Sequence, residues 1–193
     1  MLDLYVLEFD EEKDYDFDLK KLNQEVIDYV LRMDENRRDL SIFSYLNLID
    51  LLKNKYHLDK VELSFEGKPH LIDKKLYFNI AHTEGRVALA ISDQEVGVDI
   101  ERKTRRIRPD LYKKVLSEEE RIIYERRKDT SLYFLTCWVK KEAYLKYLGT
   151  GIDRHLNSIS SENLVNAKII EDEDYLISIY SKLEDLTLLH KSV

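Results

Sequence analysis

The sequence predicts an α+β protein made of two similar α/β halves, each a small, mainly antiparallel sheet packed with helices. The first half carries helical patterns followed by strands, and the second carries a strand, then helices, then further strands. Its 193 residues suffice for one large domain or for two small halves that share a core. We place the boundary so that the halves span 1–95 and 96–193.

In the first half, apolar residues alternate or cluster in short runs that are typical of strands. Strands are expected over residues 2–9, 61–65, 76–81 and 86–91. Leu19, Leu22, Val26 and Val30 recur at helical spacing, which predicts a helix over about 19–32. A second helix is expected over about 36–55, and Gly67-Lys68-Pro69 reads as a turn.

In the second half, strands are expected over residues 95–101, 164–170, 175–180 and 186–190. Ser117 is placed to cap a helix, because Glu120 three residues later can reach back to the cap N–H. A long helix is expected over about 131–148, ending at Gly149.

Composition indicates a soluble globular protein, with 44% hydrophobic and 36% charged residues. The sequence has no apolar run of ~18 residues that could cross a membrane, and residues 1–5 lack the pattern of a secretory signal. The single cysteine, Cys137, cannot form an internal disulfide and fits a reducing compartment. We therefore expect a cytoplasmic protein, and the net charge of −7 argues against general nucleic-acid binding.

A basic run interrupts this acidic chain. It comprises Arg102, Lys103, Arg105, Arg106, Arg108, Lys113 and Lys114. The simplest interpretation is a solvated loop and helix start. The functional interpretation is a docking face for an anionic ligand or an acidic protein.

Gly97-Val98-Asp99-Ile100-Glu101 has the alternation of a strand with two carboxylates on one face. These carboxylates would lie roughly 6–7 Å apart, close enough to share one hard cation such as Mg²⁺. The alternative is an edge strand with a solvated acidic face.

Glu142 lies within the apolar stripe of the long helix, one turn after Trp138. A carboxylate on a buried face is costly unless it is paired or binds a metal. Lys146 follows one turn later, so a simple i,i+4 ion pair is the alternative to a functional role. His82, at the end of a predicted strand, is open to a structural or a functional role in the same way. Together, carboxylates for Mg²⁺ with Lys and His for phosphoryl oxygens suit polyphosphate chemistry.

Three segments in register resemble the Sfp-type 4′-phosphopantetheinyl transferases. They are Phe78-Asn79-Ile80-Ala81-His82, Gly97-Val98-Asp99-Ile100-Glu101 and Trp138-Val139-Lys140-Lys141-Glu142-Ala143-Tyr144-Leu145-Lys146, with Gly67-Lys68-Pro69 before them. The resemblance covers roughly residues 65–150. The length resembles the longer members, in which one chain holds two related halves with the cofactor between them, whereas the shorter holo-acyl-carrier-protein synthases form trimers. We therefore expect this family's fold and a monomer.

The resemblance implies Mg²⁺-dependent transfer of the 4′-phosphopantetheine of coenzyme A to a serine of an apo-acyl or peptidyl carrier protein, releasing adenosine 3′,5′-bisphosphate. It implies that the metal ligands are Asp99, Glu101 and Glu142. Catalytic roles fall to Glu142, as base or by orienting a water, and to Lys146 and His82.

The same resemblance implies a coenzyme A site. Lys146 would contact the pyrophosphate, His82 the 3′-phosphate, and the backbone around Lys68 the adenine. Arg38, or its neighbour Arg37, would bind phosphate from the helix of the first half. The half 1–95 would thus hold the adenine and phosphates, and the half 96–193 the metal motifs.

Two other hypotheses compete with this one. The first is a catalytically silent relative that binds a carrier protein or a nucleotide, against which the complete set of acidic and basic site residues argues. The second is an unrelated Mg²⁺-dependent phosphoryl-transfer enzyme that uses the same carboxylates. Fatty-acid, polyketide and peptide-synthetase carriers are all candidate targets.

Overall fold

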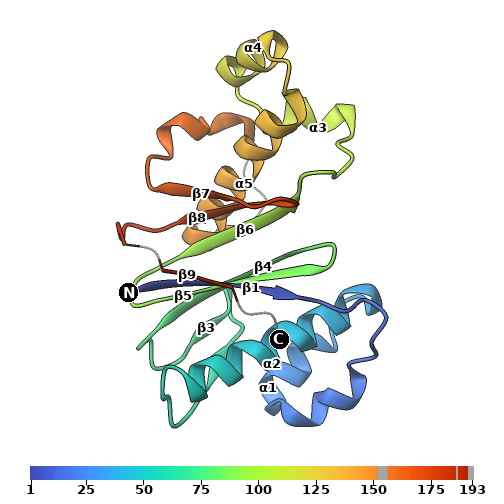
Figure 1. Cartoon of the computed structure of the whole chain (residues 1–193). Coiled ribbons are helices and arrows are strands. Elements are labelled where there is room, and N and C mark those ends of the chain that lie inside the picture. Colours follow the sequence, from blue (N-terminus) through green and yellow to red (C-terminus); the bar gives the residue numbers. More distant parts are fainter. Residues whose placement is uncertain (152–155, 186, 191–193) are drawn as a thin grey trace.

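The computed structural model describes residues 1–151, 156–185 and 187–190. Two sheets face each other in the middle of the molecule, and helices cover the outer face of each (Figure 1). This arrangement of mainly antiparallel sheets and separate helices confirms the predicted α+β class.

The first sheet has the strand order β4-β5-β1-β9. Its strands are β1 (Leu2–Glu8), β4 (Tyr77–Thr83), β5 (Arg86–Ser92) and β9 (Thr187–His190). β4, β5 and β1 pair antiparallel, and β9 pairs parallel with β1. The last strand therefore returns to the first sheet. It agrees with the expected strand over 186–190, although residue 186 lies outside the described residues.

Helices α1 (Gln24–Val30) and α2 (Glu35–Asn54) pack on the outer face of this sheet, after a short 3₁₀ helix η1 (Asp16–Lys21). α1 is shorter than the helix expected over 19–32, because the Asn23 side chain caps it by accepting a hydrogen bond from Val26 N at 3.2 Å. A two-stranded ladder, β2 (Leu63–Ser64) and β3 (His70–Leu71), completes the half.

The second sheet has the order β6-β8-β7 and is antiparallel throughout. Its strands are β6 (Gly97–Arg102), β7 (Ala167–Glu171) and β8 (Tyr175–Tyr180). The helices of this half are α3 (Pro109–Val115), α4 (Glu118–Arg126) and α5 (Thr130–Leu148), with 3₁₀ turns η2 (Leu156–Ser158) and η3 (Ser161–Asn163). The predicted capping box at Ser117 and Glu120 is confirmed at the start of α4.

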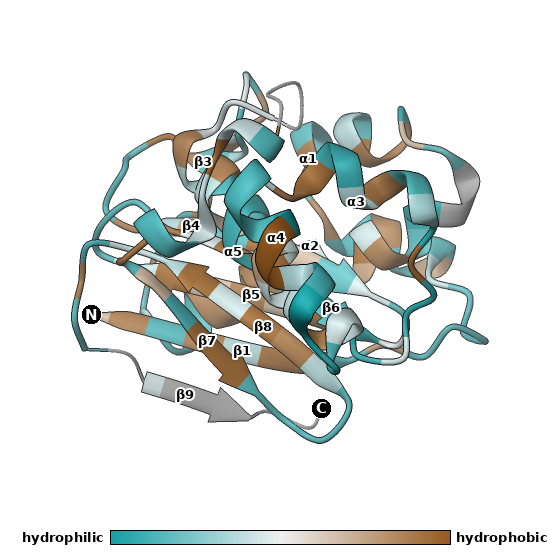
Figure 2. Ribbon diagram, turned by 90° about the horizontal axis from the view of Figure 1, so that it is seen from above, coloured by the Kyte–Doolittle hydropathy of each residue, from teal (hydrophilic) through white to brown (hydrophobic). Residues whose placement is uncertain are grey.

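The two sheets share an apolar interior. Val98 and Ile100 of β6 pack with Leu4 of β1 and with Ile177 and Ile179 of β8, and Figure 2 shows β1, β7 and β8 as largely hydrophobic strands. Because side chains alternate along a strand, the intervening residues of β6 face α5 instead. The strand thus presents its carboxylates to α5.

Within the described residues, no helix combines the length and the apolar character needed to cross a membrane.

Candidate active site

The strand β6 and the helix α5 are in direct backbone contact at Gly97. A Cβ atom at this position would lie 2.0 Å from the carbonyl oxygen of Ala143 and 2.4 Å from the nitrogen of Tyr147. Only glycine allows this approach. The contact places Asp99, two residues further along the strand, beneath the last turns of the helix.

Asp99 is 6% exposed and has two carboxylate oxygens in different surroundings. Oδ1 accepts a hydrogen bond from Lys146 Nζ at 2.7 Å, whereas Oδ2 is buried and has no hydrogen-bond partner among the described residues. Burial raises the pKa of Asp99, and the charge of Lys146 only partly offsets this. The simple ion-pair alternative required Lys146 to pair with Glu142. Lys146 pairs instead with the strand carboxylate of Asp99.

Glu101 is also buried and pairs with the guanidinium of Arg105, which lies over the Trp138 ring at 5.0 Å from its centroid. Burial and the charge of Asp99 raise the pKa of Glu101, while Arg105 lowers it. In this state each strand carboxylate carries its own counter-cation.

Glu142 faces the same region from α5 and is buried, as its place in the apolar stripe predicted. Burial, followed by the charge of Asp99, raises its pKa to about 7, and Glu101 adds to the effect. The three acidic side chains therefore share one electrostatic environment that strand and helix form together.

In the absence of metal, Glu142 is expected to make stability depend on pH. Between its ordinary pKa of 4.5 and its folded pKa of about 7 the folded chain holds a proton that the unfolded chain has released. The free energy of unfolding should therefore fall as the pH rises through this window, by up to about 3 kcal/mol. Denaturant titrations in chelator from pH 4.5 to 8 would measure the slope. Glu142→Gln should flatten it, and an equal slope in both proteins would contradict the prediction.

The site chemistry fits a hard divalent cation. Carboxylate oxygens are its preferred ligands, and the free buried Oδ2 of Asp99 offers a donor. The three carboxylates do not bring their oxygens within 4.8 Å of one another. In the described part of the chain, only Asp14, Asp16 and Asp39 do so, and these are exposed or half-buried. Like charges repel without a metal, and Lys146 and Arg105 draw the strand carboxylates toward themselves.

A cleft of about 490 Å³ opens beside these residues at the seam of the two halves. Lys68, Pro69 and Asn79 line it from the first half. Glu142, Lys146 and residues 149–151 line it from the second. The Lys68 side chain does not point into solvent: it donates to Glu95 at 2.9 Å and to the carbonyl of Val96 at 2.8 Å. It thereby ties the Gly67–Pro69 turn to the segment that precedes β6.

His82 lies further along β4 and lines neighbouring cavities with Asn79 and Asp39. Desolvation first, then the positive charges of Lys146 and Arg37, lower the pKa of His82. Arg38 is half-buried on α2, and its Nε has no hydrogen-bond partner among the described residues. The structure thus places His82 at an exposed position of β4 where the charges of Lys146 and Arg37 both reach it, with Arg38 beside Arg37 in the chain.

The basic run is more neutralised than its sequence indicated. Five of its side chains form ion pairs, which are Arg102 with Glu84, Lys103 with Glu171, Arg105 with Glu101, and both Arg108 and Lys114 with Asp110. The exposed pairs are weak and leave the cations accessible.

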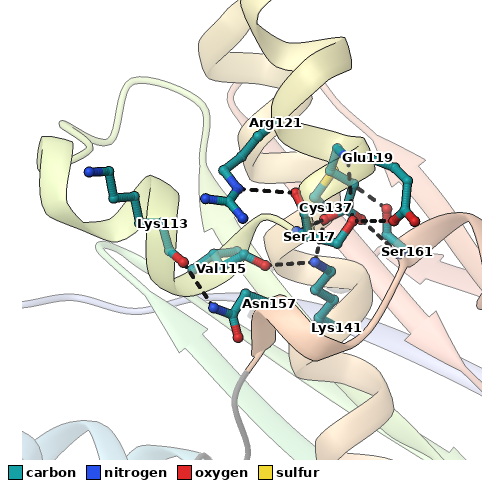
Figure 3. A network of polar contacts seen from close by, with 10 residues as sticks. Lys113, Val115, Ser117, Glu119, Arg121, Cys137, Lys141, Asn157 and Ser161 are labelled. Atoms are coloured by element: carbon teal, nitrogen blue, oxygen red, sulfur yellow. Dashed lines mark hydrogen bonds and ion pairs between the residues drawn. The ribbon is translucent and has the colours of Figure 1, made fainter.

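A buried ion pair that the sequence analysis missed anchors α5 (Figure 3). Lys141 is 0% exposed and pairs with Glu120 while donating to the carbonyl of Val115 at 2.6 Å. Glu120 also accepts from the backbone N–H groups of Ser117, at 2.8 Å, and Ser161, at 2.7 Å. The network joins the ends of α3 and α4 to the residue next to Glu142.

Removing one partner of this pair should be strongly destabilising. Lys141→Met would leave Glu120 buried without a cation, and we expect a loss of about 3–5 kcal/mol in the free energy of unfolding. Lys140→Met, at the half-buried neighbouring position, is the matched control and should cost far less. Urea denaturation measures both. Equal losses would mean that the pair has no special role.

Other contacts of the site also escaped sequence reasoning. Asn79 accepts a hydrogen bond from Val98 N at 2.8 Å and so joins β4 to β6 across the halves. Its polar side chain in an otherwise apolar strand was the available signal. For the pairing of Arg105 with Glu101, the only sequence signal was their spacing of four residues.

Comparison with known proteins agrees with this geometry. A family model described as the 4′-phosphopantetheinyl transferase superfamily matches residues 95–187. The match extends past residue 150, where the sequence motifs end. The chain is 32% identical over 117 residues to 4′-phosphopantetheinyl transferase Sfp of Bacillus subtilis, covering 57% of this chain and 52% of that protein. It is 32% identical over 127 residues to 4′-phosphopantetheinyl transferase gsp of Aneurinibacillus migulanus, covering 60% and 53%.

The chain thus spans about half the length of these relatives. The matched region nevertheless includes the strand that carries Asp99 and Glu101 and the helix that carries Glu142. On this evidence residues 95–187 match the 4′-phosphopantetheinyl transferase superfamily, and the chain is similar to transferases of the Sfp type.

Proposed function

We propose that this protein transfers the 4′-phosphopantetheine group of coenzyme A to a serine of an apo-carrier protein in a Mg²⁺-dependent reaction. The observation that carries the proposal is that Glu142 and Lys146 line a cleft to which both halves contribute, with Lys146 paired to Asp99. Similar proteins that are named 4′-phosphopantetheinyl transferases support the proposal.

The proposed metal ligands are Asp99, Glu101 and Glu142. When bound, Mg²⁺ would neutralise pyrophosphate oxygens whose charge changes as the leaving group departs. Binding requires Lys146 and Arg105 to give up their present carboxylate partners. Lys146 would then be free to contact the pyrophosphate, and the Arg105 guanidinium could remain stacked on Trp138.

Coenzyme A would follow β4 across the seam. The backbone at Lys68 would flank the adenine, because the side chain of Lys68 is already engaged with Glu95 and Val96. His82 would contact the 3′-phosphate, with Arg38 and Arg37 supplying further positive charge. The lowered pKa of His82 means that it would act as a neutral hydrogen-bond donor until a phosphate raises its pKa.

Transfer requires a base for the proton of the attacking serine. Glu142 is our candidate, directly or through a water that it orients, because it lines the cleft beside Lys146. The serine oxygen forms a bond to the phosphorus that bears pantetheine, and the bond to the leaving adenosine 3′,5′-bisphosphate breaks.

The carrier protein would dock on the face formed by the basic run, where Arg106 and Lys113 join the weakly paired Arg108 and Lys114. Carriers are typically acidic near their serine, so the charges would be complementary. We further propose a cytoplasmic monomer whose halves 1–95 and 96–193 are related by a pseudo-twofold axis, with β9 of the second half crossing over to pair with β1 of the first. The long helices α2 and α5 on opposite outer faces support such symmetry (Figure 1).

Incubation with coenzyme A, Mg²⁺ and a panel of fatty-acid, polyketide and peptide-synthetase apo-carriers tests the proposal. Mass spectrometry should show the gain of one phosphopantetheine on at least one carrier, and chelator should prevent it. If no carrier gains mass while the protein still binds a carrier or coenzyme A, the catalytically silent alternative is favoured.

Lys146→Ala should lower kcat/KM for coenzyme A about 10²-fold, because a charge that faces the pyrophosphate is lost. Steady-state kinetics with varied coenzyme A would measure this. Lys140→Ala, on the same helix, is the control and should behave like the wild type. If kcat/KM for coenzyme A is unchanged, Lys146 has no role beyond its ion pair with Asp99.

A further inference from the structure

Ser178 of β8 is a second buried polar group without a partner in the candidate site. Its side chain is 0% exposed, and its Oγ has no hydrogen-bond partner among the described residues. In the register of the second sheet it lies directly opposite Asp99. The Oδ2 atom of Asp99 shares the same condition, since it too is buried and without a partner.

The two side chains lie on the same face of the sheet. Residues opposite each other on antiparallel strands project to one side, with Cβ atoms about 4.5–5.5 Å apart. The neighbouring pair, Gly97 and Tyr180, confirms which side this is, because Tyr180 packs against Tyr144 and Tyr147 of α5. Ser178 therefore lies beneath α5, beside the carboxylate.

A buried hydroxyl without a partner destabilises a fold, whereas alanine at the same position would be neutral or stabilising. Here a buried hydroxyl donor lies beside a buried carboxylate acceptor, Oδ2, and neither has another partner within the ranges that the structure describes. A hydrogen bond between the two groups would explain why both are retained. We propose that Ser178 is a positioning residue for Asp99. It would donate a hydrogen bond to Oδ2, directly or through one water, and so fix the orientation in which the carboxylate meets the cation. The inference rests on the proposed metal site and deepens it.

The test compares variants that differ in the hydroxyl alone. Ser178→Ala and Ser178→Cys both lose a strong donor, and cysteine keeps the volume, while Ser178→Thr keeps the hydroxyl. We expect Ala and Cys to weaken Mg²⁺ binding about tenfold, measured by calorimetry with coenzyme A present and by the Mg²⁺-dependent shift in melting temperature. Without Mg²⁺ their melting temperature should equal or exceed that of the wild type. Threonine should retain wild-type Mg²⁺ affinity.

Ser181→Ala supplies the matched control. Ser181 is also buried, but its Oγ accepts a hydrogen bond from Leu183 N at 3.2 Å. This variant should lose stability and keep its Mg²⁺ affinity. The proposal is overturned if Ser178→Ala and Ser178→Cys bind Mg²⁺ like the wild type, or if they lose stability in chelator as Ser181→Ala does.

The binding readout separates this inference from the proposed function. A wild-type protein that binds Mg²⁺ but modifies no carrier would contradict the transferase activity, and the Mg²⁺ affinities of the Ser178 variants would still decide the role of the hydroxyl. A wild-type protein that modifies carriers, with Ser178 variants of unchanged Mg²⁺ affinity, would contradict the inference alone.

Discussion

Asp99→Ala is expected to abolish Mg²⁺-dependent transfer while leaving the fold intact. Asp99 is the one proposed ligand that contributes a buried oxygen without a partner, so its loss removes a donor that no nearby group replaces. We expect kcat/KM to fall at least ~10³-fold. Stability in chelator should stay constant or rise, because one of three mutually repelling carboxylates is gone and the partly exposed Lys146 can be solvated.

Carrier modification followed by mass spectrometry measures the loss of activity, and urea denaturation measures the stability. Asp185→Ala removes an exposed carboxylate from the same half and serves as the control. An Asp99→Ala protein with normal Mg²⁺-dependent rates would show that the metal assignment is wrong. An unfolded variant would instead show that Asp99 is structural.

Gly97→Ala should have the largest effect on stability. The added Cβ would overlap the backbone of Ala143 and Tyr147, which belongs to α5 and cannot move aside as a flexible side chain could. Either the helix lifts from β6 or the chain does not fold. We expect a loss of about 5 kcal/mol or more, in the range that single substitutions reach only when they disrupt a core.

Gly151→Ala is the appropriate control. A Cβ there would meet nothing within 4 Å, although its φ of +67° is unfavourable for alanine, so the cost should be about 1 kcal/mol. Circular dichroism with chemical denaturation compares the two. A Gly97→Ala protein as stable as Gly151→Ala would contradict the close packing of strand and helix.

Local patterns made much of the fold predictable. The Ser117–Glu120 capping box and the αL glycine at position 149 fix helix ends through neighbouring residues, so the sequence suffices to identify them. Alternation in β6 likewise determines that Asp99 and Glu101 share a face. The 3₁₀ turn before α1 was missed, because the cap at Asn23 outweighs the helical periodicity of the residues around it.

The site depends on contacts between residues far apart in the chain, which no local pattern reveals. Lys141 reads as one more lysine on a helix, yet it is buried against Glu120, 21 residues away. Ser178 lies opposite Asp99 only because β8 pairs with β6. Periodicity could place Glu142 on a buried face, but its closeness to the strand carboxylates required the packing that Gly97 permits.

The most direct test of the central claim is a crystal structure with coenzyme A and Mn²⁺, in which anomalous scattering locates the metal. We predict one strong peak coordinated by carboxylate oxygens of Asp99, Glu101 and Glu142. Lys146 should have moved from Asp99 to the pyrophosphate. A peak held instead by Asp14, Asp16 and Asp39, or coenzyme A bound with no metal at the seam, would contradict the account.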